Sequence, residues 1–243
     1  MLLSIIIPAY NESACIDDVI EKTNAFFAKR ADFQSEIIVV NDCSTDNTSY
    51  VLDGLQRKFT DLVCLHNEEN MGKGFSVRRG LLKAKGDYIL FMDADLSTPL
   101  NQFDILWKNM AKADVAIASR ALPESVILKH QTKIKENIAK MGNRLIRMCL
   151  RLPFHDTQCG FKLFSRKASE IFKYQTINRW GFDMEVLFIA KKCGLKIIEA
   201  PIVWSNDDTS SVRKLDYLVV FFDIFKILFN DLIGKYKINT IYV

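Results

Sequence analysis

Two aspartates, Asp93 and Asp95, directly follow the apolar run Tyr88–Met92 in the segment YILFMDADLSTP. Carboxylates at the end of a strand can hold a cation, handle a proton or cap the next helix, and Pro99 marks such a helix start. Mg²⁺ binds one or two carboxylates together with substrate phosphates. Residues two apart also share one side of an extended chain. The spacing alone leaves a metal site and a helix cap as equal alternatives.

Short aliphatic runs alternate with helical stretches through the first half of the chain. The expected strands are 2–8, 36–41, 61–66, 88–92 and 114–119, and the expected helices are 15–30, 45–58, 74–84 and 101–112. Apolar runs without alternation indicate strands buried on both faces, and strands separated by helices predict a mainly parallel sheet. Ligands of such α/β sheets bind outside the carboxyl ends of the strands. We therefore expect one ligand crevice, lined by the polar loops 8–12, 41–46, 67–73 and 93–98.

The second half of the chain is less regular. A basic helix is expected over 133–152, a strand over 196–204 and an aromatic-rich helix over about 215–233. Charged residues interrupt this last stretch, and its longest apolar run, 217–222, is far shorter than the ~20 residues of a membrane span. Because the composition does not break anywhere, we predict one domain over 1–210, followed by an amphipathic helix and tail over 211–243.

The composition is that of an ordinary folded protein of 243 residues, with 49% hydrophobic and 26% charged residues. Its six cysteines are scattered without a CxxC pair, which favours a reducing, cytosolic setting without disulfides. The apolar N-terminus lacks a basic region and meets Pro8, which predicts a first strand and no signal peptide. We therefore expect a cytoplasmic protein.

Positive charge is concentrated between Lys129 and Arg151, where seven Lys or Arg residues accompany one Glu. Besides Lys135, this segment holds four cations that the spacing places on one helical face: Lys140, Arg144, Arg147 and Arg151. An apolar stripe is expected opposite, formed by Ile138, Met141, Leu145, Met148 and Leu152. Such a helix can lie on the anionic inner face of a membrane or attract a lipid phosphate. A core-packed helix with a solvated basic face is the alternative. The segment lacks the interleaved aromatic residues of a nucleic-acid platform, so we expect no nucleic-acid partner.

Several motifs in one order resemble the inverting glycosyltransferases of family 2. They are IIIPAYNE, VVNDCSTDNT, NMGKGFSVRRGLLKAKGDYILFMDADLSTP and DTQCGFKLF. DADLSTP, DTQCGFKLF and RWGFDMEV are similar to dolichyl-phosphate glucosyltransferases and bacterial relatives that act on polyprenyl phosphate. The resemblance runs from Leu3 to about Trp204. It implies a GT-A fold, a Rossmann-like αβα sandwich around a mostly parallel sheet.

The resemblance also implies a nucleotide-sugar donor, UDP-glucose or a relative. It places five residues at the nucleotide: Pro8, Tyr10, Glu12, Asp42 and Lys73. Asp42 would accept from the imide N–H of the base, and Arg213 and Lys214 would reach the diphosphate from a closing loop. Without the resemblance, turn and helix-cap roles rank first for the residues of these loops.

The metal would be Mg²⁺ or Mn²⁺, held by Asp93 and Asp95 against the donor diphosphate, which Asp93 would also contact. Such a metal stabilises the leaving diphosphate as a Lewis acid. Ser97 stands where dolichyl-phosphate mannose synthases of this group often have Gln, and this difference favours a glucose-type sugar.

The catalytic candidates are Asp183, Asp156 and Arg120. Asp183 lies eleven residues before Gly194, like the general base of other family-2 enzymes; it also fits a helix N-terminal carboxylate favoured by the dipole. A sugar hydroxyl needs a base, whereas a lipid monophosphate with a second pKa near ~6 is already anionic. Two acceptors therefore stay open, a polyprenyl phosphate at the inner membrane face and a saccharide hydroxyl. A non-catalytic nucleotide-binding protein is the third alternative, and the oligomeric state is open.

Overall fold

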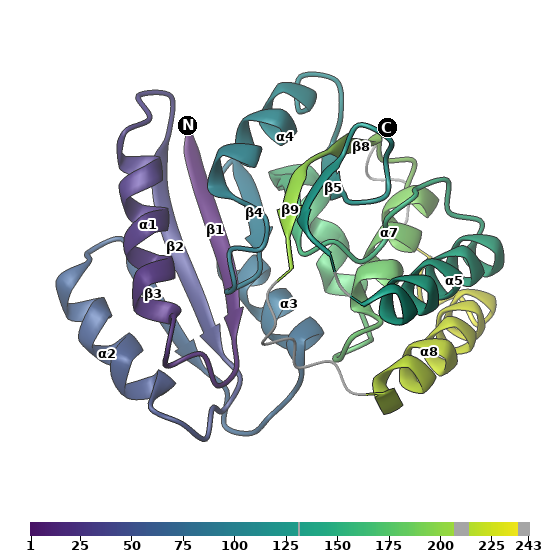
Figure 1. Ribbon diagram of the computed structural model, residues 1–243, viewed down its shortest axis with the longest axis horizontal. Helices are drawn as coiled ribbons and strands as arrows, with labels where there is room; N and C mark the ends of the chain where they lie inside the picture. Colours follow the sequence, from purple (N-terminus) through teal and green to yellow (C-terminus); the bar gives the residue numbers. More distant parts are fainter. Residues whose placement is uncertain (131, 207–213, 238–243) are drawn as a thin grey trace.

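The computed structural model describes residues 1–130, 132–206 and 214–237, without the side chains of 134, 135 and 214–218. A seven-stranded sheet with the order β3-β2-β1-β4-β7-β5-β8 forms the centre (Figure 1). Its strands are β1 (Leu2–Ala9), β2 (Gln34–Asn41), β3 (Leu62–His66), β4 (Tyr88–Met92), β5 (Val115–Ser119), β7 (Phe161–Ser165) and β8 (Ile197–Pro201). Only β7 runs antiparallel to its neighbours, β4 and β5. The predicted mainly parallel sheet is confirmed.

Helices cover both faces of this sheet and make three layers. One hydrophobic core lies under α1 (Ile16–Ala28), α2 (Thr48–Lys58) and α4 (Phe103–Asn109). The other lies under α3 (Lys73–Lys83), α5 (Lys133–Leu150), α7 (Phe182–Lys192) and α8 (Lys214–Leu232), with the short α6 (Arg166–Ser169). Along β1, Ile5 and Ile7 enter the first core and Ile6 the second, because side chains alternate across a strand. The αβα sandwich is therefore built on strands that are apolar on both sides.

Two strands were not expected from the sequence. β7 carries Lys162 among apolar residues, which breaks the hydrophobic run that marks a buried strand. β6 (Val126–Lys129) pairs with β9 (Val203–Ser205) in a separate two-stranded sheet. The single strand expected over 196–204 is in fact two, since Ile202 separates β8 from β9.

The basic helix ends earlier than expected. α5 stops at Leu150, and Arg151 caps it in the left-handed conformation, with φ 52°. Leu152, which was assigned to the apolar stripe, is instead buried in the core, 4% exposed. Arg151 and Leu152 therefore leave the two helical faces to which the spacing assigned them.

The C-terminal helix forms as expected, and Ile224 and Ile227 pack it onto the second core. In the described ranges, no helix combines the length and the hydropathy that crossing a bilayer requires. The predicted domain boundary near residue 210 lies outside the described residues.

Candidate active site

The loops that follow β1 and β2 are tied together by hydrogen bonds. The Oδ1 atom of Asn11 accepts from the backbone N–H of Thr45 at 2.8 Å. The backbone N–H of Glu12 donates to the Oγ1 of Thr48 at 2.9 Å. These contacts give the carboxyl edge of the sheet a defined shape, as the crevice hypothesis requires.

Backbone strain marks the same edge. Asn11, Cys43 and Leu96 follow β1, β2 and β4, and each has a positive φ, between 50° and 58°. A left-handed Leu or Cys costs conformational energy, and such residues concentrate at binding and catalytic sites. The three strained positions therefore support a functional site in these loops.

The side chain of Asp42 joins the loops after β2 and β3. It is buried and accepts from Asn67 Nδ2 at 2.6 Å, Met71 N at 2.9 Å and Gly72 N at 2.7 Å. An ionised carboxylate has about four acceptor positions, so one remains for a ligand. The contact of Asp42 with a base stays a prediction. Asn67 holds this carboxylate and was not expected from the sequence.

The other predicted nucleotide residues lie along the same edge. Pro8 is half-buried near the end of β1, Tyr10 is 43% exposed, and Glu12 is half-buried in the next turn. Arg213 lies outside the described residues, and only the backbone of Lys214 is described, at the start of α8.

Lys73 lies in the first turn of α3, beside Asp93. Its Nζ is 2.7 Å from Asp93 Oδ1 and within 5.7 Å of the ring centres of Phe91 and Trp180. Burial lowers the pKa of Lys73, but the charges of Asp93 and Asp183 outweigh it and raise the pKa. Lys73 is therefore a fixed cation beside the aspartate pair, and Trp180 is a further residue of the site.

Asp93 and Asp95 do not lie on an extended strand. The expectation that their spacing of two puts them on one side of an extended chain is therefore not met. β4 ends at Met92, Ala94 and Asp95 form a turn, and the backbone N–H of Ser97 donates to Asp95 at 2.9 Å. The two carboxylates still interact, because desolvation and the charge of Asp93 together raise the pKa of Asp95. The turn, rather than the pleat of a strand, brings them together.

The fit to a divalent cation rests on Asp93. Its Oδ1 is buried, and the ammonium of Lys73 is the group that lies beside it among the described residues, at 2.7 Å. A Cβ on Gly160 would lie 1.9 Å from Asp93 Oδ2, so this carboxylate needs a glycine beside it. In the described part of the chain, no set of three or more Asp, Glu, His or Cys residues could hold a metal. Two carboxylates with open positions suit Mg²⁺ or Mn²⁺ that shares substrate phosphates.

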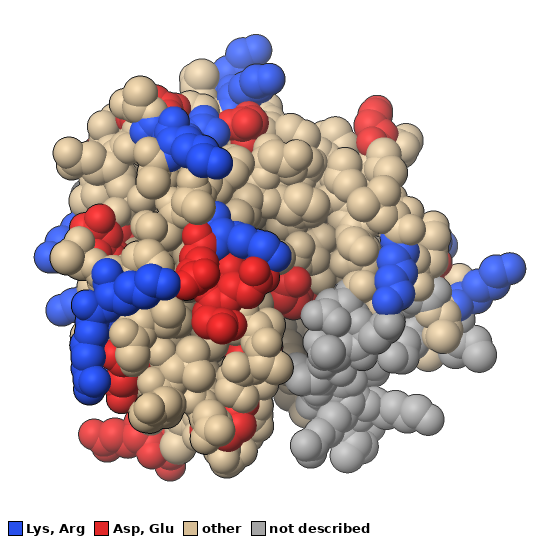
Figure 2. All heavy atoms as spheres, turned by 60° about the vertical axis from the view of Figure 1, so that its left-hand side comes forward, with Lys and Arg blue, Asp and Glu red and all other residues tan. Residues whose placement is uncertain are grey.

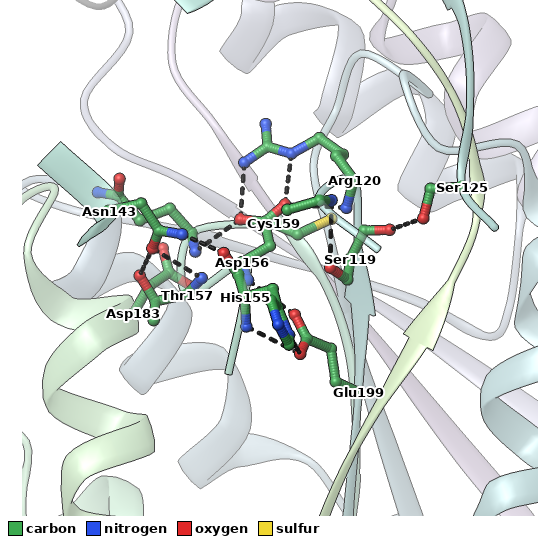
Figure 3. Close-up of polar contacts among 12 residues, drawn as sticks. Ser119, Arg120, Ser125, Asn143, His155, Asp156, Thr157, Cys159, Asp183 and Glu199 are labelled. Carbon is green, nitrogen blue, oxygen red and sulfur yellow. Dashed lines mark hydrogen bonds and ion pairs between the residues drawn. The ribbon is translucent and has the colours of Figure 1, made fainter. Parts of the chain in front are cut away.

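Arg120 and Asp156 form one ion pair (Figure 3). Arg120 donates to the Asp156 carboxylate from Nε at 2.7 Å and from Nη2 at 3.0 Å. Glu199 accepts from the backbone N–H of His155 and of Asp156, and so fixes this loop. Burial raises the pKa of Asp156, but the Arg120 charge outweighs it and lowers the pKa. The two predicted catalytic residues act as a unit.

Asp183 is buried in the first turn of α7 and pairs with Lys162. The same Lys162 Nζ donates to the carbonyl of Cys159 at 2.6 Å. Burial raises the pKa of Asp183 against the opposing charges of Lys162 and Lys73. Lys162 was missed from the sequence, although a lone lysine within the apolar run FKLF could have signalled it.

The predicted basic face belongs to α5 and its cap residue Arg151. Lys140 and Arg144 are exposed on α5, Arg147 is half-buried, and the side chain of Lys135 is not described. Figure 2 shows another face, where a compact group of acidic side chains near the centre lies beside Lys and Arg side chains, and further acidic side chains are scattered toward the edges. On the described part of that face, both signs of charge are interleaved, unlike the basic surface that nucleic acid binds.

The sequence model of glycosyl transferase family 2 matches residues 4–172. The chain is 32% identical to a dolichyl-phosphate beta-glucosyltransferase of Trichomonas vaginalis, over 98% of this chain and 76% of the relative. It is 34% identical to the protein of that name from Dictyostelium discoideum, over 98% and 77%.

Solved structures share the fold. Glucosyl-3-phosphoglycerate synthase from Mycobacterium tuberculosis, in complex with Mn²⁺, UDP and phosphoglyceric acid, aligns with TM-score 0.66 and 19% identity, over 94% of this chain and 78% of that one. Mannosyl-3-phosphoglycerate synthase from Rubrobacter xylanophilus aligns with TM-score 0.68 and 17% identity, over 100% and 77%. The predicted GT-A architecture is confirmed.

Proposed function

The chain belongs to glycosyltransferase family 2, and from that premise we propose that it transfers glucose from UDP-glucose to dolichyl or another polyprenyl phosphate, with inversion. The observation that carries this proposal is its similarity to dolichyl-phosphate beta-glucosyltransferases over 98% of the chain. The carboxyl-edge site supplies the groups that such a transfer needs.

The donor would lie across the loops after β1, β2 and β3. Its nucleotide would contact Pro8, Tyr10, Glu12, Asp42 and Lys73. The contacts of Asp42 with Asn67, Met71 and Gly72 hold its carboxylate in place before the base arrives. A preorganised acceptor discriminates between bases, because a wrong base would leave it unpaired. Arg213 and Lys214 would bind the diphosphate.

Asp93 and Asp95 would hold Mg²⁺ or Mn²⁺ at the diphosphate. When bound, the metal neutralises the charge that develops on the leaving diphosphate. Lys73, 2.7 Å from Asp93 Oδ1, contributes a further positive charge at this position. Gly160 leaves the space that the Asp93 carboxylate occupies.

A phosphate oxygen of the lipid would attack the anomeric carbon from the side opposite the leaving UDP. The sugar–UDP bond breaks as the new bond forms, which inverts the anomeric configuration. Because the lipid phosphate is already anionic, no group has to take a proton from it. Arg120 donates to Asp156 through Nε and Nη2, and its Nη1 would donate to the acceptor phosphate.

Asp183 has a different role in each acceptor hypothesis. With a saccharide hydroxyl it would be the general base, whereas with a lipid phosphate it orients the site together with Lys162. The α5 cations, Lys135, Lys140, Arg144 and Arg147, with Arg151 at its cap, would attract the lipid phosphate. A polyprenyl acceptor also implies peripheral contact with the cytoplasmic face of a membrane.

The test is a donor-by-acceptor transfer assay with UDP-glucose, UDP-N-acetylglucosamine and GDP-mannose. Each donor is combined with dolichyl phosphate, undecaprenyl phosphate or a free glycan. We expect transfer from UDP-glucose to the lipid phosphates, its loss with EDTA and its recovery with Mg²⁺ or Mn²⁺.

Asp93→Asn should lower the rate at least 100-fold. Asp61→Asn, which changes an exposed aspartate in the turn before β3, should leave the rate unchanged. Equal transfer to the free glycan would refute the lipid acceptor. Strong loss of glycan transfer in Asp183→Asn would then support the base role.

A further inference from the structure

α8 buries polar side chains and exposes a row of large apolar ones. Asp223 and Asn230 are buried, 9% and 2% exposed, and flank Ile224 and Ile227 on the core-facing side. The outward side carries Phe222, Phe225, Phe229 and Leu232, which are 55–83% exposed. A helix on a water-facing surface normally has the reverse arrangement. The outer face of α8 therefore fits an apolar environment.

Specific contacts hold α8 in this orientation. Asn230 Nδ2 donates to Thr176 Oγ1 at 2.9 Å and to the hydroxyl of Tyr236 at 3.3 Å. Tyr236 in turn donates to the fully buried Glu185 at 2.5 Å. Rotating the helix to bury its phenylalanines would break this network and leave Glu185 without one of its donors.

α5 lies beside α8 and has a matching apolar row (Figure 1). Its exposed members are Ile138, Met141, Leu145 and Met148, with the same sequence spacing as Phe222, Phe225, Phe229 and Leu232. The inward side of α5 packs through Ile146 and Leu150 instead. We name these eight exposed residues the α5–α8 face.

Cations accompany this face. Lys140, Arg144 and Arg147 immediately precede Met141, Leu145 and Met148, so each lies about 100° around the helix from an apolar member. This combination of an apolar row and adjacent cations binds anionic bilayers in the interfacial plane. A second copy of the chain would present the same cations again, and like charges oppose that pairing.

We propose that the α5–α8 face docks on the surface of a lipid bilayer that contains anionic headgroups. This proposal rests on the proposed function in one respect: a lipid acceptor explains why the protein needs to reach a bilayer. The apolar row enters the headgroup–acyl boundary, and the cations of α5 bind the headgroups.

Both helices touch loops of the candidate site. Asn143 of α5 binds Thr157 and the carbonyl of His155, next to Asp156. Asp223 and Asn230 of α8 contact the segment 176–181, which leads into α7 and Asp183. Docking through the α5–α8 face therefore places the bilayer beside the loops that would receive a lipid phosphate.

The test is co-sedimentation with vesicles, without nucleotide or dolichyl phosphate. The vesicles are phosphatidylcholine alone, or phosphatidylcholine with about 30% phosphatidylglycerol. We expect binding to the anionic vesicles that weakens with added salt. Phe225→Ser/Phe229→Ser/Leu232→Ser should lower the partition coefficient at least tenfold. Lys140→Glu/Arg144→Glu should remove the preference for phosphatidylglycerol.

The matched control is Tyr50→Ser/Leu82→Ser, which removes exposed apolar side chains on α2 and α3. It should bind vesicles like the unchanged protein, and thermal unfolding checks that all variants fold. Equal vesicle binding by the α8 variant overturns the proposal. So does a dimer that does not bind vesicles and that the α8 variant converts to a monomer, because the face would then belong to a second copy.

A second readout separates this proposal from the proposed function. Transfer to a short-chain, water-soluble polyprenyl phosphate should be unchanged in the α8 variant. If this transfer fails in the unchanged protein while vesicles bind, the proposed function falls and the docking surface stands. If transfer occurs and vesicles do not bind, the docking surface falls.

Discussion

The charge of Asp183 depends on a neighbour that is equally buried. Lys162 and Asp183 are 1% and 5% exposed, and the lysine also binds the carbonyl of Cys159. A buried ion pair is balanced, but either partner alone is an uncompensated charge in a low dielectric. Lys162 is therefore a positioning residue for Asp183.

Lys162→Met should lower the free energy of unfolding by about 3–5 kcal/mol, because it leaves the Asp183 carboxylate buried without its cation. Lys162→Met/Asp183→Asn should recover at least half of that loss, as measured by chemical denaturation. Glucose transfer should stay low in both variants. Lys58→Met, in an exposed pair with Glu21, is the control and should cost less than about 1 kcal/mol. A double variant no more stable than Lys162→Met would contradict the pairing argument.

Gly160 should matter through the space that it leaves for Asp93. In Gly160→Ala, the new Cβ would displace the Asp93 carboxylate, and a shift of about 1 Å in a catalytic group costs roughly 100-fold in rate. The matched control is Gly54→Ala in α2, where a Cβ meets nothing within 4 Å. It should stabilise the helix by up to about 1 kcal/mol and leave transfer unchanged. Full activity of Gly160→Ala would show that transfer does not depend on the position of the Asp93 carboxylate.

At the scale of elements, β7 has the largest effect on the site. This antiparallel strand lies between β4 and β5, so the chain entering it places Gly160 against Asp93, and the strand places Lys162 against Asp183. The segment before it carries Asp156 to Arg120 at the end of β5. β7 and the segment before it therefore set the position of two side-chain ion pairs and of the glycine beside Asp93.

α8 contributes a carboxyl group, that of Asp223, whose ionisation opposes the packing of the helix onto the core. Burial raises the pKa of Asp223 to about 6, Lys226 lowers it, and the charge of Glu185 raises it further. Its Oδ2 has no hydrogen-bond partner in the described ranges. A carboxyl with a raised folded-state pKa stabilises the fold fully below its unfolded pKa, near pH 4, and loses that contribution as the pH rises through about 6.

Asp223→Asn should therefore be more stable than the unchanged protein above pH 6. The neutral amide does not ionise in the buried position, and the difference in Tm should shrink toward zero below pH 4. Thermal unfolding of both proteins at pH 4, 5, 6 and 7.5 measures this window. A difference that stays constant over the whole range would rule out the ionisation of Asp223 as its cause.

At the scale of the whole molecule, the site is formed by loops at the carboxyl edge of the sheet. Residues from the loops after β1, β2, β3 and β4 lie on one side. Arg120 follows β5, and Asp156 and Asp183 come from the second half of the chain. Lys73 links the two, since the charges of both Asp93 and Asp183 act on it. A ligand that spans this edge should therefore stabilise the entire fold.

UDP and Mn²⁺ together should raise the Tm by more than the sum of their separate effects, because the metal bridges the aspartates and the diphosphate. At 100 times its Kd a ligand adds about 2.7 kcal/mol, which corresponds to roughly 5–10 °C here. Asp93→Asn should lose the metal-dependent part, and ADP with Mn²⁺ should have a smaller effect. Equal stabilisation by UDP with and without metal would contradict a shared site.

The sequence by itself determined the alternation of strands and helices, the edge at which polar loops meet and most of the candidate residues. Those features follow from hydrophobic runs and loop chemistry, which are local. Asp93, Asp95, Asp42 and Lys73 were placed together because parallel strands end at one edge.

Only the tertiary structure decided which charges neutralise each other. Arg120 with Asp156 and Lys162 with Asp183 are 36 and 21 residues apart, and no local pattern encodes such pairs. The sequence does not reveal β7 because Lys162 interrupts its apolar run. Lys162 can be buried there because it pairs with Asp183. The outward apolar side of α8 was undecided for the same reason. An amphipathic pattern shows that a helix has two sides, and the contacts of Asn230 and Tyr236 determine which one faces the core.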